Sequence, residues 1–179
     1  MAFSEYRVPS FNMYALPQDT QVTCWAACAA SARACKERRA YTEETALPEA
    51  FRAWYTQPRP LRFDDISNVY RAMGMQAGRI DLSSRPALAQ FIRAHAPIIV
   101  GSAIVTPQGA HVSYHVRLIN GFWGDPDAGN EDAFQVRIYD PWPPSGFAFE
   151  TNFLFSHFRY QMTMRSGRVP ENIGRIWYF

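Results

Sequence analysis

The sequence predicts an α+β fold in which helices form the first half of the chain and an antiparallel sheet forms the second. Residues 24–38 are rich in alanine and contain no glycine or proline, which favours a helix. After Pro97 the chain changes to short apolar runs with many β-branched and aromatic residues, a pattern typical of buried strands. Helices and strands in separate runs indicate helices packed against an antiparallel sheet.

The helices of the first half are predicted from their start and stop signals. Thr23 precedes the alanine-rich run, where its side chain would cap the helix. Asp64 would cap a helix that ends at Gly74, and Ser84 followed by Pro86 would open another one. The predicted helices cover residues 24–38, 46–56, 64–74 and 84–95.

The strands of the second half are separated by turn-forming residues. Strands are predicted over residues 98–104, 112–122, 134–139, 146–149 and 176–179, with a turn over 124–132 and a short helix over 152–160. Residues 1–17 lack periodicity and are predicted to form an extended arm or loop. Since we find no internal repeat and no linker, we predict a single domain over residues 1–179. Its 47% hydrophobic content is enough for a substantial core.

Composition and charge argue against several classes of partner. The formal net charge is +2 and no block of like charges stands out, so no nucleic-acid partner is expected. The longest apolar stretches are far shorter than the roughly 20 residues that a membrane helix needs, so no membrane association is expected. The first residues lack the basic segment and apolar run of a secretory signal peptide. We therefore expect a soluble protein that is cytoplasmic when synthesised.

The three cysteines, Cys24, Cys28 and Cys35, lie close together in the predicted helix. An odd, clustered set is a poor disulfide framework. No second pair of cysteine or histidine residues completes a tetrahedral zinc site, so no metal site is expected. The cysteines are therefore expected to be free thiols, and one of them is placed for reactivity.

Cys24 is that thiol, because it lies where a loop becomes a helix. The positive end of the helix dipole favours the thiolate, which is the nucleophilic form. Cys28 and Cys35 lie further inside the helix and are expected to be packing residues. Gln18 precedes Cys24 in the loop, and its amide is a candidate donor to an oxyanion, with Gln21 as a rival. The plain alternative for Cys24 is a small buried hydrophobic residue.

A nucleophilic thiol needs an imidazole, and His111 and His115 are the candidates in the predicted sheet. Their spacing puts both on the same face of a strand, so periodicity cannot choose between them. Asp140 ends the next predicted strand, and its carboxylate would orient the imidazole by accepting a hydrogen bond from Nδ1. The alternative for Asp140 is an initiator of an Asp-Pro turn. His95 and His157 are expected to have structural roles.

The order of these residues resembles the papain-like cysteine protease superfamily, especially its compact bacterial branch of staphopain-like proteases and effector proteases of plant pathogens. Gln18 and Cys24-Trp25 resemble the oxyanion glutamine and nucleophile of that family. The segment from His115 to Phe122 resembles its histidine strand, and this resemblance selects His115 over His111. Asp140-Pro141-Trp142 resembles the third catalytic position with its following tryptophan.

The resemblance implies a papain-like fold and a Cys-His-Asp triad with Gln18 as oxyanion donor. A helical lobe over about residues 18–96 would carry Cys24 at the start of its central helix. A sheet lobe over about residues 97–179 would carry His115 and Asp140. The implied activity is hydrolysis of a peptide or amide bond in a protein or peptide substrate, with no metal or organic cofactor. The alternatives are other acyl transfers by the same triad (amidase, deamidase, transglutaminase-like or peptidoglycan-peptide hydrolase chemistry) and a papain-like shell used only for binding.

The resemblance also suggests a biological role. Small proteases of this kind resemble bacterial effectors or toxins that a dedicated secretion system delivers into another cell. A toxic peptidase would imply a cognate inhibitor or immunity protein in the producing cell. A housekeeping cytosolic enzyme is the competing hypothesis.

Overall fold

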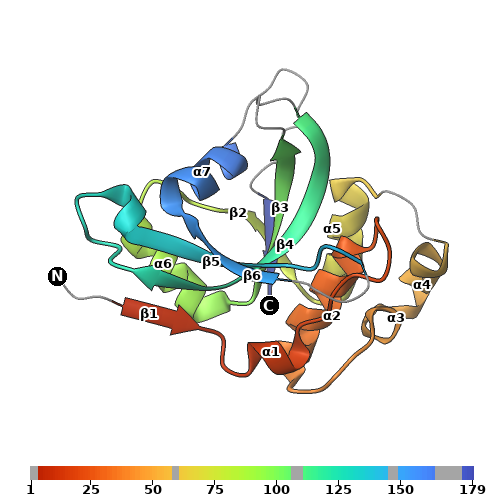
Figure 1. Ribbon diagram of the computed structural model, residues 1–179. Helices are drawn as coiled ribbons and strands as arrows, with labels where there is room; N and C mark the ends of the chain where they lie inside the picture. Colours follow the sequence, from red (N-terminus) through yellow and green to blue (C-terminus); the bar gives the residue numbers. More distant parts are fainter. Residues whose placement is uncertain (1–3, 58–60, 106–110, 145–148, 164–174) are drawn as a thin grey trace.

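The computed structural model describes residues 4–57, 61–105, 111–144, 149–163 and 175–179. Its helices are α1 (Phe11–Tyr14), α2 (Cys24–Glu37), α3 (Glu43–Ala46), α4 (Glu49–Thr56), α5 (Phe63–Ala72), α6 (Arg85–His95) and α7 (Phe155–Thr163), with a 3-10 turn η1 (Glu131–Ala133). Its strands are β1 (Ser4–Arg7), β2 (Gln76–Arg79), β3 (Ile98–Val105), β4 (His111–Gly124), β5 (Phe134–Asp140), β6 (Phe149–Leu154) and β7 (Arg175–Tyr178). The predicted α+β class is thus confirmed (Figure 1).

The strands form one antiparallel sheet of seven strands, in the order β2-β7-β3-β4-β5-β6, with β1 paired to β4. β4 is long enough to pair with β3 along its first part and with β1 along its last part. Gly121 permits this second pairing, because a Cβ there would lie 2.1 Å from the backbone oxygen of Tyr6. The N-terminal strand therefore extends the sheet beyond the first residue of β3, Ile98, which pairs with Ile119 of β4.

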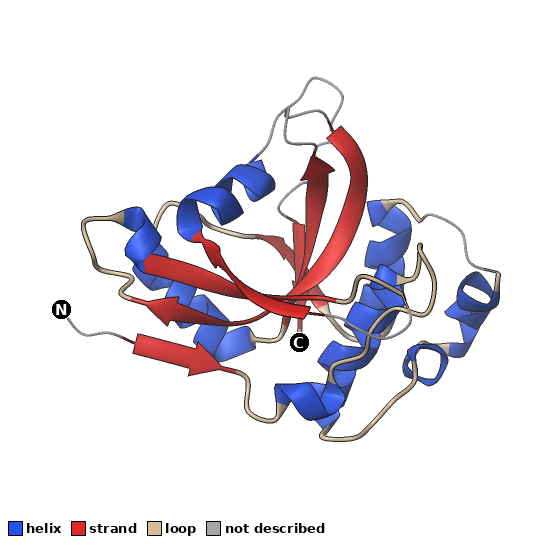
Figure 2. Cartoon of the chain, viewed as in Figure 1, coloured by secondary structure: helices blue, strands red, loops and turns tan. Residues whose placement is uncertain are grey.

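Helices cover both faces of the sheet, and each layer encloses a hydrophobic core (Figure 2). On one face the small side chains of α2 let this helix pack closely against the sheet residues Val116, Leu118 and Trp177. On the other face α6 and α7 pack against Ile119 and Ile138. Neighbouring residues of β4 thus point to opposite cores, as the pleat of a strand requires. This arrangement places the N-terminus of α2 beside the sheet.

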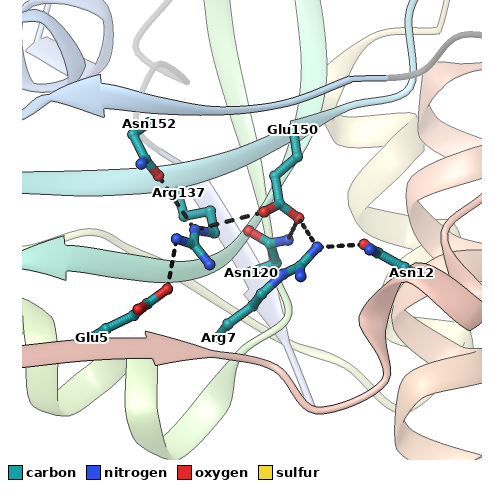
Figure 3. A network of polar contacts seen from close by, with 7 residues as sticks. All are labelled: Glu5, Arg7, Asn12, Asn120, Arg137, Glu150 and Asn152. Carbon is teal, nitrogen blue, oxygen red and sulfur yellow. Dashed lines mark hydrogen bonds and ion pairs between the residues drawn. The ribbon is translucent and has the colours of Figure 1, made fainter.

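A network of polar side chains joins β1 to the sheet (Figure 3). Arg137 of β5 donates a 2.8 Å hydrogen bond to Glu5 and lies 3.6 Å from Glu150 of β6. Glu150 also accepts hydrogen bonds from Arg7 at 2.9 Å and from the buried Asn120 at 2.7 Å. The network therefore ties four strands together on one side of the sheet.

Most predicted elements are present, and the differences in the first half have local causes. The helix predicted over 46–56 begins only at Glu49, because Pro48 places Leu47 in an extended conformation, and the preceding helix α3 was not predicted. The helix predicted over 64–74 begins at Phe63, whose ring packs in the core. The carboxylate of Asp65 reaches back to the N-cap residue, so the expectation that Asp64 caps this helix was wrong.

The other differences concern β1, α1, β2, β6 and the bounds of α7. The predicted arm over residues 1–17 contains β1 and α1, and β2 was not predicted at all. The strand predicted over 146–149 lies outside the described residues except for Phe149, which begins β6. β6 continues to Leu154, so α7 starts later than the helix predicted over 152–160. None of the described helices has the length and apolar character needed to span a membrane.

Candidate active site

Cys24 is the first residue of α2 and is partly exposed. The prediction that Thr23 caps this helix was wrong, because its side chain makes no hydrogen bond to the first turn. Its hydroxyl oxygen instead accepts a 3.0 Å hydrogen bond from the backbone N–H of Thr20. The backbone ladder begins with the N–H of Ala26, which donates to the Thr23 carbonyl at 2.9 Å. The N–H of Cys24 therefore lies at an end of the helix without a side-chain cap, where the helix dipole favours negative charge.

His115 of β4 and Asp140 at the end of β5 lie side by side, with only 6% and 7% of their surfaces exposed. Nε2 of His115 lies 2.6 Å from Oδ1 of Asp140, which also accepts a 3.0 Å hydrogen bond from the N–H of Trp142. The expected contact of the carboxylate with Nδ1 was wrong. A hydrogen bond with Cys24 is among the causes that raise the pKa of the same imidazole.

These contacts set the charge of the imidazole. Burial lowers the pKa of His115, but hydrogen bonds with Asp140 and Cys24 outweigh it and raise the pKa to about 9. Burial pushes the pKa of Asp140 upward, while the hydrogen bond and charge of His115 and the charge of Arg117 bring it below its usual value. At neutral pH His115 is therefore an imidazolium that donates its Nε2–H to the Asp140 carboxylate.

Gln18 lies in the loop before α2, and only 1% of its surface is exposed. Its backbone N–H donates to the carbonyl of Pro141 at 2.9 Å, which joins this loop to the segment after Asp140. Its side-chain Nε2 donates to the carbonyl of Thr20 at 2.5 Å, and an amide nitrogen carries a second N–H. Gln21, the rival donor, is exposed. Gln18 is thus buried beside the segment after Asp140, whereas Gln21 is exposed, and the oxyanion role of Gln18 stays a prediction.

Glu43 of α3 supports the same loop and was missed in the sequence. Its side chain is buried, with 3% of its surface exposed, and Oε1 accepts a 2.9 Å hydrogen bond from the N–H of Asp19. Burial, together with the nearby charge of Asp19, raises the pKa of Glu43 to about 8. No signal in the sequence separates this glutamate from its exposed neighbour Glu44, because only the tertiary structure places it under the loop.

Glu43→Gln is expected to stabilise the fold at alkaline pH. Between pH 4.5 and about 8 the folded state keeps a proton on Glu43 that the unfolded state has released, so stability falls as pH rises through this window. Glutamine keeps the acceptor for Asp19 and removes the titration. Allowing for partial solvent screening, the gain in free energy of unfolding above pH 8 is about 1–3 kcal/mol.

Urea unfolding at pH 5, 7 and 9 would measure this effect. The difference between Glu43→Gln and wild type should grow with pH and level off above about 8. Glu44→Gln is the matched control, since Glu44 is exposed in the same helix. A difference that is the same at all three pH values would contradict the assignment of a buried, protonated Glu43.

The remaining cysteines are free thiols in packing positions, as the sequence predicted. Cys28 is fully buried one turn after Cys24, and its sulfur donates to the carbonyl of Val116 at 3.4 Å. Burial raises the pKa of Cys28 well above its ordinary value. Burial also raises the pKa of Cys35 to about 11. Both thiols are therefore less ready to ionise than an ordinary cysteine.

The other histidines lie apart from this arrangement. His95 packs against the rings of Phe91 and Tyr178, with centroids 4.6 Å from each. His157 packs against Phe153 at 5.3 Å. The backbone of His111 lies at the start of β4, opposite Val105 of β3. Within the described ranges, no three His, Cys, Asp or Glu side chains are grouped so that they could hold a metal ion.

Comparison with known proteins places the chain in a family. Residues 6–152 match the family model of the papain-like cysteine protease AvrRpt2. A search of curated proteins found no match. The matched range includes Gln18, Cys24, His115 and Asp140 and covers far more than half of the chain. The papain-like resemblance seen in the sequence is thereby confirmed, and the chain belongs to the AvrRpt2 family of papain-like cysteine proteases.

Proposed function

We propose that this cysteine protease hydrolyses peptide bonds of a protein substrate through Cys24, His115 and Asp140, with Gln18 as an oxyanion donor. The observation that carries the proposal is the 2.6 Å contact of His115 Nε2 with Asp140, together with the hydrogen bond and charge of Cys24 that help to raise the pKa of the same imidazole. A cationic imidazole in this position stabilises a neighbouring thiolate.

The first half-reaction forms an acyl-enzyme. The Cys24 thiolate attacks the carbonyl carbon of the scissile bond, and the Gln18 amide and the Cys24 backbone N–H donate to the resulting oxyanion. The C–N bond then breaks, and His115 gives its Nδ1 proton to the leaving amine. In the second half-reaction, neutral His115 takes a proton from water, and the hydroxide attacks the thioester. The carboxylic acid product leaves, and the thiolate–imidazolium pair is restored.

Asp140 keeps its role through both half-reactions. Its carboxylate accepts the Nε2–H and so fixes both the ring orientation and the tautomer in which Nδ1 exchanges the proton. Because the backbone N–H of Trp142 donates to the same oxygen, the carboxylate is fixed in turn.

Proteolysis of a cell lysate would test this function against other acyl transfers. We expect purified wild type to create new protein N-termini, identified by mass spectrometry after labelling of free amines. The same lysate treated with Cys24→Ala should show none. New N-termini shared by both proteins, or mass changes of deamidation or cross-linking without new N-termini, would contradict a Cys24-dependent peptidase.

Gln18→Ala tests the oxyanion role. Removal of one oxyanion donor costs about 10²–10³-fold in kcat, with a smaller change in KM, because the interaction forms only in the transition state. Gln21→Ala, at an exposed position in the same loop, is the matched control and should retain wild-type activity. Steady-state kinetics on a peptide derived from the lysate experiment would measure both, and a larger loss for Gln21→Ala would reverse the assignment.

We further propose that the protein acts as a bacterial effector or toxin, delivered outside the producing cell and countered inside the producing cell by a cognate inhibitor. The support is the family match to AvrRpt2 and the resemblance to effector proteases of plant pathogens. Expression in a test cell would examine this role. Wild type should impair growth and Cys24→Ala should not, whereas equal growth with both would favour a housekeeping enzyme.

A further inference from the structure

Arg117 is a largely buried cation next to the candidate active site, and nothing in the sequence marked it for a role. It lies two residues after His115 in β4, so both side chains point to the same side of the strand. Only 12% of the Arg117 side chain is exposed. Its Nε lies 2.9 Å from Oδ2 of Asp140. The N–H does not align with that oxygen as a hydrogen bond, so the contact is an ion pair.

Arg117 completes the surroundings of the Asp140 carboxylate. Oδ1 of Asp140 accepts from Nε2 of His115 and from the backbone of Trp142. Oδ2 faces Arg117. The two oxygens of the carboxylate therefore have different partners, and rotation of the group about its Cβ–Cγ bond would break contacts on both sides.

The guanidinium of Arg117 is itself held in place by helix α7. One of its terminal nitrogens donates a 2.9 Å hydrogen bond to Oε1 of Gln161 in α7. Gln161 is buried, and its amide nitrogen lies 3.2 Å from Nε2 of His157. Arg117 thus links Asp140 to a packed helix rather than to solvent.

A permanent cation can balance the charge of Asp140 throughout the reaction, which His115 cannot do. While His115 is an imidazolium, it balances the buried charge of Asp140. After His115 has given its proton to a leaving group, the carboxylate would be buried without a counter-charge, which is costly. An arginine stays protonated throughout. Arg117 therefore keeps Asp140 ionised in the part of the cycle when His115 is neutral.

We propose that Arg117 is a positioning residue of this active site, which holds the Asp140 carboxylate through its second oxygen and is anchored by Gln161. This inference rests on the proposed function, in which Asp140 orients His115. It assigns no contact with substrate to Arg117.

The charge of Arg117 also acts on the groups around it. The titratable side chains that face this region are Cys24 and Cys28 of α2, Glu43 of α3, His115 of β4, Tyr139 and Asp140 of β5, and, through Gln161, His157 of α7. Loss of one positive charge makes the potential at Cys24 and His115 more negative. Both protons then leave at higher pH, so both limbs of the pH profile of kcat/KM should move to higher pH.

The test compares Arg117→Met with Arg117→Lys. Methionine removes the charge and both contacts, and we expect kcat/KM at neutral pH to fall about 10–100-fold, as for other residues that orient a catalytic group. Both limbs of the pH profile of kcat/KM should move to higher pH. Lysine restores the charge but cannot reach two partners with a planar fork. It should therefore return the limbs to their wild-type positions and recover only part of kcat.

Arg137→Met is the matched control. Arg137 has the same 12% exposed side chain, lies in the neighbouring strand β5 and is paired with Glu5 and Glu150 (Figure 3). It has no contact with the triad in the described residues. If both Met variants lose activity equally and the limbs stay in place, the role of Arg117 is only structural and the proposal is overturned. Wild-type kinetics for Arg117→Met would overturn it as well.

A second readout separates this inference from the proposed function. The rate of alkylation of Cys24 by iodoacetamide across pH reports the thiolate without any substrate. Arg117→Met should move this alkylation profile to higher pH, and Arg117→Lys should not. If the wild type cleaves no protein, the proposed function fails while the alkylation profile still decides the role of Arg117. An unmoved alkylation profile in Arg117→Met overturns the role even if the wild type is an active peptidase.

Discussion

Replacement of Cys24 by serine is expected to lower kcat/KM by about four orders of magnitude or more, as for loss of the nucleophile in other hydrolases. Serine is nearly isosteric, so the fold should be unaffected at this partly exposed position. A hydroxyl, however, ionises far less readily than a thiol, so the pair of a charged nucleophile and an imidazolium does not form in the serine variant.

The helix that carries Cys24 also supplies the control. Cys35→Ser makes the same chemical change at another partly exposed position of α2, and its activity should equal that of wild type. Kinetics on a cleaved peptide, together with thermal unfolding of each variant, would measure both effects. Substantial activity in a folded Cys24→Ser protein would show that the nucleophile lies elsewhere.

The sequence limited the candidate triad to a few residues because chemistry limits the residue types, and the resemblance to papain-like proteases then selected His115 over His111. A thiol at a helix start, an imidazole in a strand and a carboxylate at the next strand end are few enough in this chain to be found in order. What the sequence could not choose was the contact geometry. Which nitrogen of His115 meets Asp140 depends on how the side chains of β4 and β5 approach each other, and the structure places Nε2 there.

The residues that support the site could not be predicted from local sequence patterns. Glu43 and Arg117 have the composition of ordinary surface residues, and only the packing of α3 and α7 buries them. The same reason explains β2, whose mostly exposed residues 76–79 form a strand only because β7 pairs with it. In contrast, Pro48 was visible in the sequence, and its effect on the preceding residue should have placed the start of the helix predicted over 46–56 after Pro48.

His115→Ala is expected to reduce kcat/KM by about 10³–10⁴-fold, because both the proton donor and the partner of the thiolate are lost. The more specific result concerns Cys24 itself. An ordinary thiol, with a pKa of about 8.5, is less than about 1% thiolate at pH 6. In wild type the imidazolium next to Cys24 favours the thiolate, so iodoacetamide should label Cys24 rapidly below pH 7. In His115→Ala, labelling at pH 6 should slow by about 10–100-fold, since the rate follows the thiolate fraction.

The raised pKa of His115 also determines how stability and activity change with pH. The pKa of His115 rises from 6.5 to about 9 on folding, because its hydrogen bonds with Asp140 and Cys24 outweigh burial. The stabilisation from the charged pair is therefore fully present below pH 6.5 and is lost as pH rises through about 9. The alkaline limb of kcat/KM should fall near this value in wild type.

His95→Ala is the matched control, since His95 packs between aromatic rings and should leave the labelling of Cys24 unchanged. Labelling of Cys24 that rises only near pH 8.5 and is the same with and without His115 would contradict the thiolate–imidazolium pair, because the thiol would then titrate as if the histidine were absent.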